Sequence, residues 1–339
     1  MVRRTRIVAG LGLLGVIIGV LGVWRYAASR RPHPQPFNIA FNEWVGFAPF
    51  FVAKDLGYFG NLPVDFDFIA VEGDKRAGLY AGRFQMICET LDMFETSRES
   101  QDFPGKIIFA IDESFGGDGV IAVKEVQTLK DLRGANVVAE PGQPSYFILQ
   151  YLLHKEGMTL RDIKVQSMNS SDAAAAFIAK KADVAGTYEP YLTQALQKRP
   201  GSHLLVSSTD LPGYIVDVAI VRAETLNSRR EDLVAILRGW CMAVEQFKIH
   251  RSESVANMAK AFKITPDEFT RTVEGLRYFD CSRGQTFMGT GAANGPIFEI
   301  FKNVGTILNE NNLTSVTVSA QDRIDPSVVQ AVAASEGNR

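Results

Sequence analysis

The stretch GFAPFFVAKDLGYF, residues 46–59, carries the signals that decide the fold. Pro49 stands in the first turn of a predicted helix, where a missing backbone N–H costs no hydrogen bond. Gly57 ends that helix, because glycine readily adopts the left-handed conformation found at helix C-termini. Phe50 and Phe51 lie on the helix and are expected in the core. The stretch therefore predicts a short helix packed against the rest of the fold.

Strand-like and helix-like segments alternate on both sides of this helix. Short apolar runs predict buried strands, and strands separated by helical segments of about ten residues are typical of α/β proteins. The sequence therefore predicts mainly parallel sheets flanked by helices, with a helical C-terminal part. The predicted strands are residues 37–41, 64–71, 84–88, 106–111, 136–139, 165–168 and 184–188. The predicted helices are residues 49–56, 74–81, 144–155, 171–180, 191–198, 231–250, 252–262, 266–277 and 296–310.

Charge is unevenly distributed along the chain. The first 35 residues hold six arginines and no acidic residue, which leaves 30 basic and 38 acidic residues in the remainder. The remainder therefore has a net charge of −8. Nucleic-acid binding requires basic patches that neutralise phosphates. We therefore expect no nucleic-acid partner.

Residues 1–31 form a signal or anchor segment outside the predicted fold. Arginines flank an uncharged, apolar run of 18 residues, 7–24. The apolar cores of export signals span roughly 7–15 residues, whereas membrane-spanning helices need roughly 17–25. The length of the run favours an uncleaved membrane helix, although Ala-Ala-Ser at 27–29 leaves a cleaved export signal open. Three prolines make residues 32–36 a short, stiff linker.

The three cysteines, Cys88, Cys241 and Cys281, show no metal-binding spacing. Their odd number and the lack of a CxxC motif argue against a zinc site or a redox dithiol. Cys88 ends an apolar run and is expected to be a buried thiol. Cys241 and Cys281 can pair in an oxidising compartment, but the sequence alone favours two free thiols. We expect neither a metal nor a cofactor.

The candidate functional residues follow the predicted strands, because ligands of open α/β sheets bind beyond the carboxyl ends of the strands. These loops contain carboxylates, aromatic rings, hydroxyls and glycines, but no histidine, lysine or arginine. A hydrolase triad needs a base beside its nucleophile, and the sequence also lacks GxSxG, HExxH and GxxxxGK[ST] motifs. We therefore expect no enzyme. The loops are residues 42–47, 89–90, 112–118, 140–146 and 189–191.

Several of these loops resemble those of the solute-binding proteins of nitrate-, sulfonate- and taurine-type ABC importers. That family also includes binders of thiamine pyrimidine precursors. The stretch 46–59 resembles its N-terminal signature, and Tyr188-Glu189-Pro190 matches an element in which tryptophan is commoner than tyrosine. The likeness extends from about residue 37 to residue 243. The other matching stretches are DESFGGD at 112–118, LKDLRG at 129–134, DAAAAF at 172–177 and KADVA at 181–185.

The resemblance implies an α/β, two-lobed periplasmic-binding-protein fold of type II, preceded by the N-terminal membrane helix. One lobe comprises residues 37–118 and 217–339, and the other comprises residues 119–216. Hinge bending closes the lobes around a ligand. The implied location is the periplasm, or the extracytoplasmic face of the inner membrane with residues 7–24 in the bilayer. The implied partners are a small solute and the permease and ATPase subunits of an ABC transporter.

Carried over residue by residue, the resemblance implies a pocket between the lobes. Glu43, Glu113 and Asp118 are instead expected to serve as caps or in ion pairs at the hinge. The expected ligand-binding residues are Trp44, Gly46, Phe47, Glu89, Thr90, Asp112, Ser114, Gln143, Ser145, Tyr146, Glu189 and Asp217.

The residue types in the expected pocket favour a cationic ligand over a simple oxyanion. A nitrate or sulfate site calls for lysine, arginine or many hydroxyls, whereas these loops offer acids and aromatic rings. A desolvated cation gains from carboxylates and from cation–π attraction to rings such as Trp44 or Tyr146, worth roughly 0.5–2 kcal/mol. A zwitterion such as an aminosulfonate also fits, with its anionic end at Ser145, where a helix begins.

Two other functions remain open. A membrane-tethered sensor or accessory subunit can use the same clamp to report a ligand to a partner. Neighbouring genes distinguish this role from transport, because an adjacent ATPase and permease favour transport and a kinase or cyclase favours sensing. A thiamine-pyrimidine synthase-like enzyme is less consistent with the sequence, because such enzymes use a cysteine-rich motif and an active-site histidine.

Overall fold

The computed structural model describes residues 35–96, 105–290, 293–310 and 318–336. The predicted signal or anchor segment and most of the linker lie outside these ranges. Within the described residues, no helix combines the length and hydrophobicity needed to cross a membrane.

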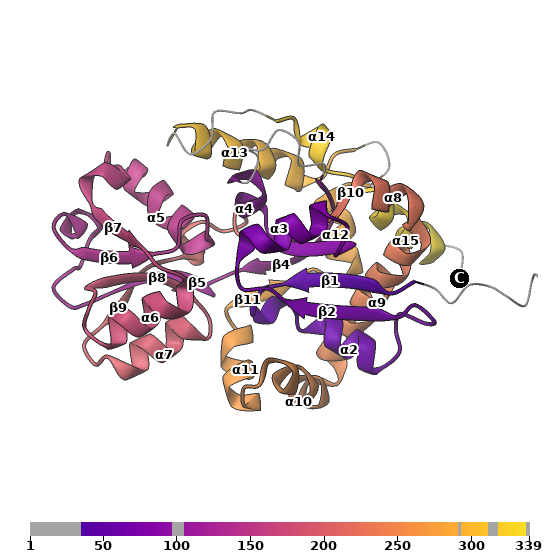
Figure 1. Cartoon of the computed structure of the whole chain (residues 1–339), viewed down its shortest axis with the longest axis horizontal. Coiled ribbons are helices and arrows are strands. Elements are labelled where there is room, and N and C mark those ends of the chain that lie inside the picture. Colours follow the sequence, from indigo (N-terminus) through magenta and orange to yellow (C-terminus); the bar gives the residue numbers. More distant parts are fainter. Residues whose placement is uncertain (1–34, 97–104, 291–292, 311–317, 337–339) are drawn as a thin grey trace, which may run out of the picture.

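The described chain forms two lobes side by side, each built on one β-sheet (Figure 1). The sheet of the first lobe has six strands in the order β11-β4-β10-β3-β1-β2. The sheet of the second lobe has five in the order β7-β6-β8-β5-β9. The strands of the first are β1 (Phe37–Phe41), β2 (Val64–Phe68), β3 (Met86–Thr90), β4 (Gly105–Ser114), β10 (Val216–Arg222) and β11 (Leu276–Tyr278). The strands of the second are β5 (Asp118–Ala122), β6 (Asn136–Ala139), β7 (Lys164–Ser167), β8 (Val184–Tyr188) and β9 (His203–Ser207).

Both sheets are mixed, which corrects the prediction of mainly parallel sheets. In the first sheet, β1 is parallel to β2 and β3, but β10 is antiparallel to β3 and β4. In the second, β6 is parallel to β7 and β8, but β5 is antiparallel to β8 and β9. The chain passes between the sheets twice, at residues 115–117 and 208–215. The strand that follows each passage, β5 or β10, is antiparallel to both of its neighbours in the sheet.

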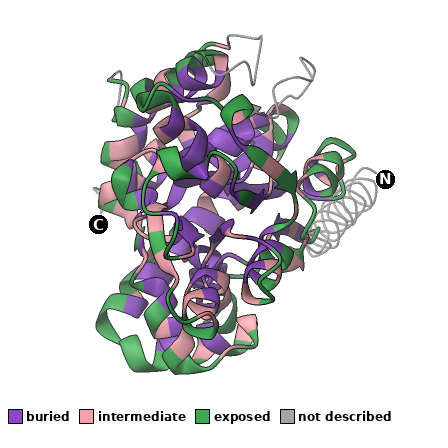
Figure 2. Ribbon diagram, turned by 90° about the vertical axis from the view of Figure 1, so that its left-hand side faces the viewer, coloured by how far each residue is buried: buried purple, intermediate pink, exposed green. Residues whose placement is uncertain are grey.

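Helices cover both sheets, and the side-chain alternation of the strands fits this arrangement. Successive residues of a strand face opposite sides of the sheet. Val120 accordingly packs in a cluster with Leu149 of the overlying helix, and its neighbour Ile121 packs in another with Phe177. Buried residues line both sheets, whereas the outer helix faces are exposed (Figure 2). The second lobe has α5 (Pro144–Lys155), α6 (Ser170–Ile178), α7 (Tyr191–Lys198), and the 3-10 helices η3 (Leu129–Leu132), η4 (Leu160–Asp162) and η5 (Ser208–Asp210).

The first lobe holds the large core, in which the predicted helix of the opening stretch takes part. Phe50 on that helix lies against Trp240, with 4.8 Å between ring centroids. The helices are α2 (Pro49–Asp55), α3 (Glu72–Tyr80), α4 (Leu91–Thr96), α8 (Ala223–Ser228), α9 (Arg230–Ile249), α10 (Arg251–Phe262), α11 (Pro266–Val273), α12 (Cys281–Met288), α13 (Pro296–Glu310), α14 (Ala320–Arg323) and α15 (Ser327–Glu336), with the 3-10 helix η1 (Val45–Phe47).

Two predictions in the C-terminal part are wrong. The helix predicted over residues 266–277 ends at Val273, and Leu276–Tyr278 instead forms β11, which pairs with the edge of β4. Cys241 and Cys281 are not free thiols but form a disulfide that joins α9 to α12. Its two cysteines are 40 residues apart in sequence, so the fold, rather than local spacing, brings them together. Cys88 is buried and free, as predicted.

Candidate ligand cleft

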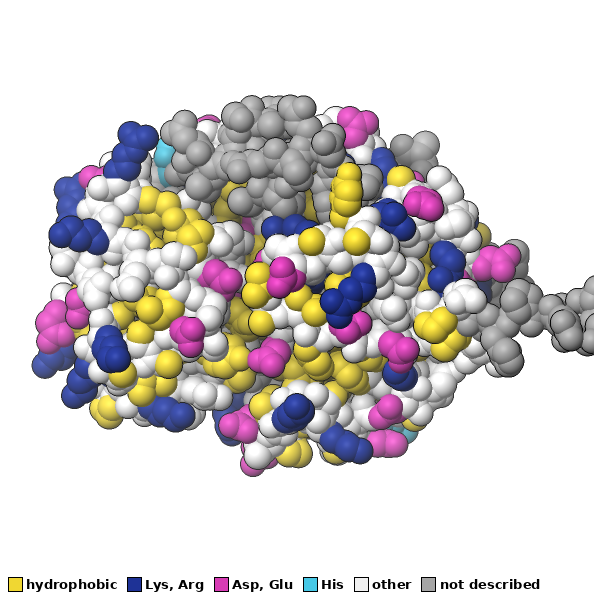
Figure 3. Space-filling model, viewed as in Figure 1, with side chains coloured by type: hydrophobic (Ala, Val, Ile, Leu, Met, Phe, Trp, Pro, Cys, Tyr) yellow, Lys and Arg dark blue, Asp and Glu magenta, His cyan; other side chains and the backbone are white. Residues whose placement is uncertain are grey.

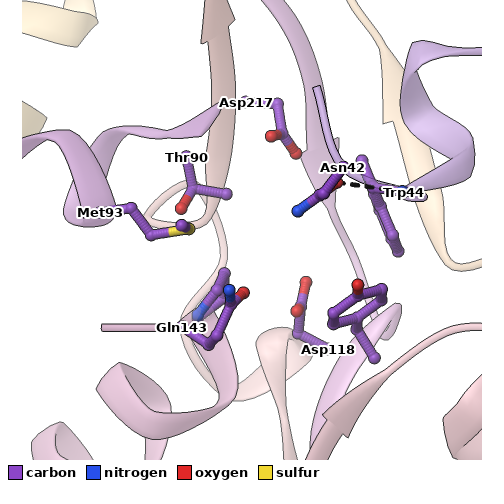
Figure 4. A pocket seen from close by; sticks show the side chains of 9 residues that line it. Asn42, Trp44, Thr90, Met93, Asp118, Gln143 and Asp217 are labelled. Carbon is purple, nitrogen blue, oxygen red and sulfur yellow. Dashed lines mark hydrogen bonds between the residues drawn. The ribbon is translucent and has the colours of Figure 1, made fainter. Parts of the chain in front are cut away.

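A pocket lies where the two lobes meet (Figure 4). It contains about 280 Å³ of space not filled by protein atoms, its open mouth included. Figure 4 shows the carboxylates of Asp118 and Asp217 and the amides of Asn42 and Gln143 around this one space. The lining residues are Asn42, Trp44, Thr90, Met93, Asp118, Gln143, Pro144, Tyr188 and Asp217.

The strand ends place these side chains. Asn42 directly follows β1, Thr90 ends β3, and Tyr188 ends β8. Carboxyl ends of parallel strands meet at the same edge of a sheet, so the loops after them converge. Asp118 begins β5 and Asp217 is the second residue of β10. Each follows one of the two passages between the lobes, so a carboxylate from each passage reaches the pocket.

Of the twelve predicted ligand-binding residues, four line this pocket: Trp44, Thr90, Gln143 and Asp217. Gln143 precedes the first turn of α5, where its carbonyl accepts hydrogen bonds from the backbone N–H groups of Tyr146 and Phe147. These bonds hold the backbone of Gln143 at the start of the helix, and the residue, which lines the pocket, is only 4% exposed.

Other predicted residues are engaged elsewhere. Phe47 is fully buried in the core, stacked on Phe41 with 5.2 Å between ring centroids. Glu89 accepts a hydrogen bond from Arg76 Nε at 3.0 Å. Ser114 lies 2.9 Å from the hydroxyl of Ser208, which also accepts from the backbone N–H of Gly116. We place these three predicted residues in the core or at the passages between lobes, not in the pocket wall.

In the second lobe, three predicted residues lie beside the pocket without lining it. Ser145 is 1% exposed, and its hydroxyl has no hydrogen-bond partner among the described residues. Tyr146 is half-buried on the next position of α5. Glu189 accepts from the hydroxyl and the backbone N–H of Thr193, at 2.5 and 3.2 Å. The Glu189 carboxylate therefore caps α7.

The two remaining predicted residues, Gly46 and Asp112, lie behind Trp44. The indole Nε1 of Trp44 donates to both Asp112 oxygens, at 3.1 and 3.3 Å. Asp112 is fully buried, and Gly46 passes directly beneath this contact.

Five lining residues were not predicted from the sequence to bind the ligand. Asp118 was expected at the hinge, yet its carboxylate faces the pocket. Tyr188 belonged to the quoted YEP element, and Asn42 was the first residue of a candidate loop, so both carried a usable signal. Pro144 lay within the candidate loop 140–146 and carried the same signal. Met93 carried none, because methionine is ordinary in helices.

Burial without counter-ions governs the electrostatics of the pocket. Desolvation raises the pKa of Asp112 to about 8 and that of Asp118 to about 7. Burial, followed by repulsion from Asp112 and Asp118, raises the pKa of Asp217 well above its usual range. Asp217 and Asp112 are directly paired residues on the neighbouring strands β10 and β4. Two like charges at such close range cannot both ionise easily.

Nearby cations are occupied by other groups. Lys75, fully buried, donates to the backbone oxygen of Cys88 at 2.8 Å and forms an ion pair with Glu72. Arg76 is paired with Glu89. Among the described residues, the pocket wall includes neither lysine nor arginine. No group of three or more histidine, cysteine or acidic side chains in the described residues is arranged to hold a metal ion. The arrangement is suited to a ligand that supplies positive charge or hydrogen-bond donors.

Two α/β lobes joined by two passages of chain, with a pocket between them, define the periplasmic-binding-protein class of fold. The chain belongs to the NMT1/THI5-like family, whose family model matches residues 44–249. The resemblance found in the sequence is thereby confirmed at the level of the family.

Solved structures share this fold at low sequence identity. The alkanesulfonate-binding protein SsuA from Xanthomonas axonopodis pv. citri, bound to MOPS, is similar with a TM-score of 0.72 and 14% identity, over 87% of this chain and 99% of that one. The periplasmic nitrate-binding protein NrtA from Synechocystis PCC 6803 gives a TM-score of 0.68 and 15% identity, over 90% and 89%. The desulfurization enzyme DSZB also matches, with a TM-score of 0.64 and 10% identity over 88% and 99%. One fold therefore serves binding proteins and an enzyme.

Among curated proteins, a candidate binding protein of Brucella abortus (strain 2308) is 27% identical over 159 residues. The match covers 46% of this chain and 50% of that protein. The chain thus spans half the length of this curated relative.

Proposed function

We propose that this protein is the extracytoplasmic solute-binding component of an ABC importer and that its ligand binds in the cleft between the lobes. Membership of the NMT1/THI5-like family and the fold shared with SsuA and NrtA support a binding role. In this proposal, the lobes 37–118 with 217–339 and 119–216 close over the solute, and the permease and ATPase subunits receive it. The segment 7–24 exports the protein or tethers it to the inner membrane.

The ligand that we propose is a small amine-type solute, cationic or zwitterionic. The observation that carries this proposal is the pair Asp118 and Asp217, two buried carboxylates on the pocket wall without an ion-pair partner among the described residues. Trp44 and Tyr188 add aromatic surface, which attracts a desolvated cation. An ammonium or amidinium group between the carboxylates restores the charge balance that burial has removed.

A zwitterion is also accommodated. Its anionic end would lie at the first turn of α5, near Gln143 and Ser145, where backbone N–H groups and the helix dipole favour negative charge. The unpartnered hydroxyl of Ser145 supports this orientation. The ligand's cationic end would then meet the aspartates across the pocket.

Calorimetric titration with methylammonium, ethanolamine, acetamidine, taurine and nitrate tests the proposal. We expect binding of one or more of the nitrogen cations or of taurine, and none of nitrate. Asp217→Asn should weaken that binding about 100-fold, because it removes a charge-assisted contact worth roughly 3 kcal/mol. Asp65→Asn, on an exposed strand position, is the matched control and should leave the affinity unchanged. Tight binding of nitrate alone would refute the amine-type ligand.

An enzyme of the same fold is the weaker proposal, although DSZB shows that the fold supports catalysis. The described residues of the pocket wall include no histidine, cysteine or lysine that could act as base or nucleophile. A sensor role differs from transport only in the partner. Co-purification of the full-length chain from membranes with a permease and an ATPase, rather than with a kinase or cyclase, separates these two roles.

A further inference from the structure

The indole of Trp44 is held from several sides in the wall of the pocket between the lobes. Its N–H donates to the Asp112 carboxylate at 3.1 Å. Its ring meets Tyr188 of the second lobe edge-on, with 6.1 Å between centroids and 84° between planes. Trp44 remains only 5% exposed. A ring held in this way is a fixed boundary of the pocket, not a mobile side chain.

Two glycines leave room for this placement. A Cβ atom at Gly46 would lie 2.1 Å from Asp112 Oδ2 and 2.2 Å from Trp44 Nε1. A Cβ atom at Gly117 would lie 2.4 Å from Trp44 Cη2 and 2.9 Å from the backbone oxygen of Gly275. Real Cβ contacts are not this short, so the indole and its hydrogen bond require glycine at both positions. Gly117 belongs to the first passage between the lobes, which is therefore enclosed between the indole and the turn at Gly275.

Asp112 has no place of its own in the pocket wall. Its carboxylate is fully buried, lies behind the indole and is absent from the lining residues. We infer that Asp112 is a positioning residue that acts through Trp44, and that the Trp44 indole held in this way sets the shape of the pocket. This inference rests on the proposed binding function of the cleft. It replaces the expectation that Asp112 contacts the ligand.

The Trp44 indole lines the pocket and also lies against Gly117 and Tyr188. The pocket, the first passage and the second lobe therefore share one ring. Loss of the Asp112 acceptor leaves a buried indole N–H without a partner, which favours another orientation of the ring. The pocket then changes shape although no lining residue has been replaced.

A double-mutant cycle with ethanolamine as probe, and taurine as second probe, tests whether Asp112 acts through Trp44. Trp44→Phe removes the indole N–H, and Asp112→Leu removes its acceptor. Because both variants remove the same interaction, each should weaken binding about tenfold, and the double variant should be no weaker than either. Asp112→Asn is the conservative variant, whose amide oxygen still accepts the indole N–H, and should bind within about twofold of wild type.

Additive losses, or an Asp112→Asn variant as weak as Asp112→Leu, would show that Asp112 contacts the ligand and would overturn the inference. The indole N–H signals in a nitrogen-15 NMR spectrum provide a readout that needs no ligand. Trp44→Phe assigns the Trp44 signal, and Trp240, whose N–H donates to Phe279 at 2.8 Å, serves as internal reference.

We expect Asp112→Leu and Gly117→Ala to shift the Trp44 signal and leave that of Trp240 in place, whereas Asp112→Asn should leave both signals near their wild-type positions. An unmoved Trp44 signal in Asp112→Leu would overturn the positioning role. If neither probe binds the wild type, the proposed amine-type ligand fails, and the NMR result still decides whether Asp112 holds the ring. Thermal melts confirm that each variant is folded.

Discussion

The buried carboxylates of the first lobe and of its junction with the second lobe include two contrasting groups. One group forms ion pairs with arginines, and the other has no such partner. Behind the pocket, Glu89 is paired with Arg76, and Glu113 is paired with Arg283 and also accepts from the backbone N–H of Gly213 at 2.9 Å. These pairs tie helices to strands, and the Glu113 pair lies beside the second passage between the lobes. Their charges are balanced within the fold.

Asp112, Asp118 and Asp217 form the other group, and none of them makes an ion pair with a described lysine or arginine. Burial of an unpaired carboxylate destabilises a protein, and the raised pKa values of these three groups record that cost. Asp118 and Asp217 line the pocket, whereas Asp112 accepts the indole N–H of Trp44 directly behind it. The acids without a counter-ion therefore lie in or directly behind the pocket wall, and the paired acids do not line it.

We expect this contrast to have its largest effect on the pH dependence of the free energy of unfolding. Asp118 has a pKa raised from 3.8 to about 7 in the fold. Its protonated form is therefore favoured when folded, and stability is highest below the unfolded pKa and is lost as pH rises through the folded pKa. A shift of about 3 pKa units corresponds to about 4 kcal/mol at most.

Denaturant unfolding of the ligand-free protein should accordingly show falling stability between pH 4 and pH 8. Asp118→Asn should remove up to about 4 kcal/mol of that fall, because an amide does not titrate. The exposed Asp131, whose Thr128 hydrogen bonds lower its pKa, is the opposite case, and Asp131→Asn should lower stability at neutral pH. If Asp118→Asn left the pH dependence of stability unchanged, burial of the Asp118 carboxylate would not destabilise the fold, and the contrast with the paired acids would fail.

The second-largest expected effect is the loss of stability when an ion pair of the paired group is broken. Arg283→Met removes the cation and leaves the Glu113 carboxylate, 9% exposed, without compensation. We expect a loss of about 2 kcal/mol in urea unfolding, below the usual figure for fully buried pairs because the Arg283 side chain is 36% exposed. Arg283→Lys keeps the charge and should recover about half of the loss. Equal stability of wild type and Arg283→Met would show that the pair contributes nothing.

The sequence predicted much of the fold, and its failures have a common cause. The helix at Pro49–Asp55 and the strands at Phe37–Phe41 and Val184–Tyr188 match their predictions because local apolar spacing determines them. The strand Val216–Arg222 is also rich in apolar residues, yet it was not predicted, and it follows a passage between the lobes instead of a helix of about ten residues. The strand is antiparallel to its neighbours because the chain returns from the second lobe before forming it. The local pattern of apolar residues does not predict that return.

The candidate site was less predictable for a related reason. Trp44, Thr90 and Gln143 were predicted in the pocket wall from loops that follow predicted strands, whereas Asp217 was predicted from the family resemblance alone. Whether an acid at the end of a strand faces a ligand, an arginine or an indole depends on residues distant in sequence. Asp112 and Trp44 are 68 positions apart, and no spacing rule links them.

A smaller effect concerns ligand affinity. A cation binds best to ionised carboxylates, so its binding must displace the protons held near neutral pH by Asp118 and Asp217, the two aspartates that line the pocket. Affinity for ethanolamine should therefore rise about tenfold between pH 6 and pH 8 and then level off. Titrations in buffers of different ionisation enthalpy should show proton release at pH 7. Affinity that is independent of pH, or proton uptake, would mean that the cation is not bound by these groups.

We expect the smallest effect from an exposed ion pair, which serves as the reference for the effects of the buried charges. Lys54 Nζ lies 3.0 Å from Asp65 Oδ1, and the two side chains are 43% and 64% exposed. Water already solvates both charges, so Asp65→Asn should change the unfolding free energy by less than about 0.5 kcal/mol, with little pH dependence above pH 5. If denaturant unfolding instead gave a loss as large as that of Arg283→Met, burial would not be what separates strong from weak charge effects here. The contrast between balanced and unbalanced carboxylates would then lose its physical basis.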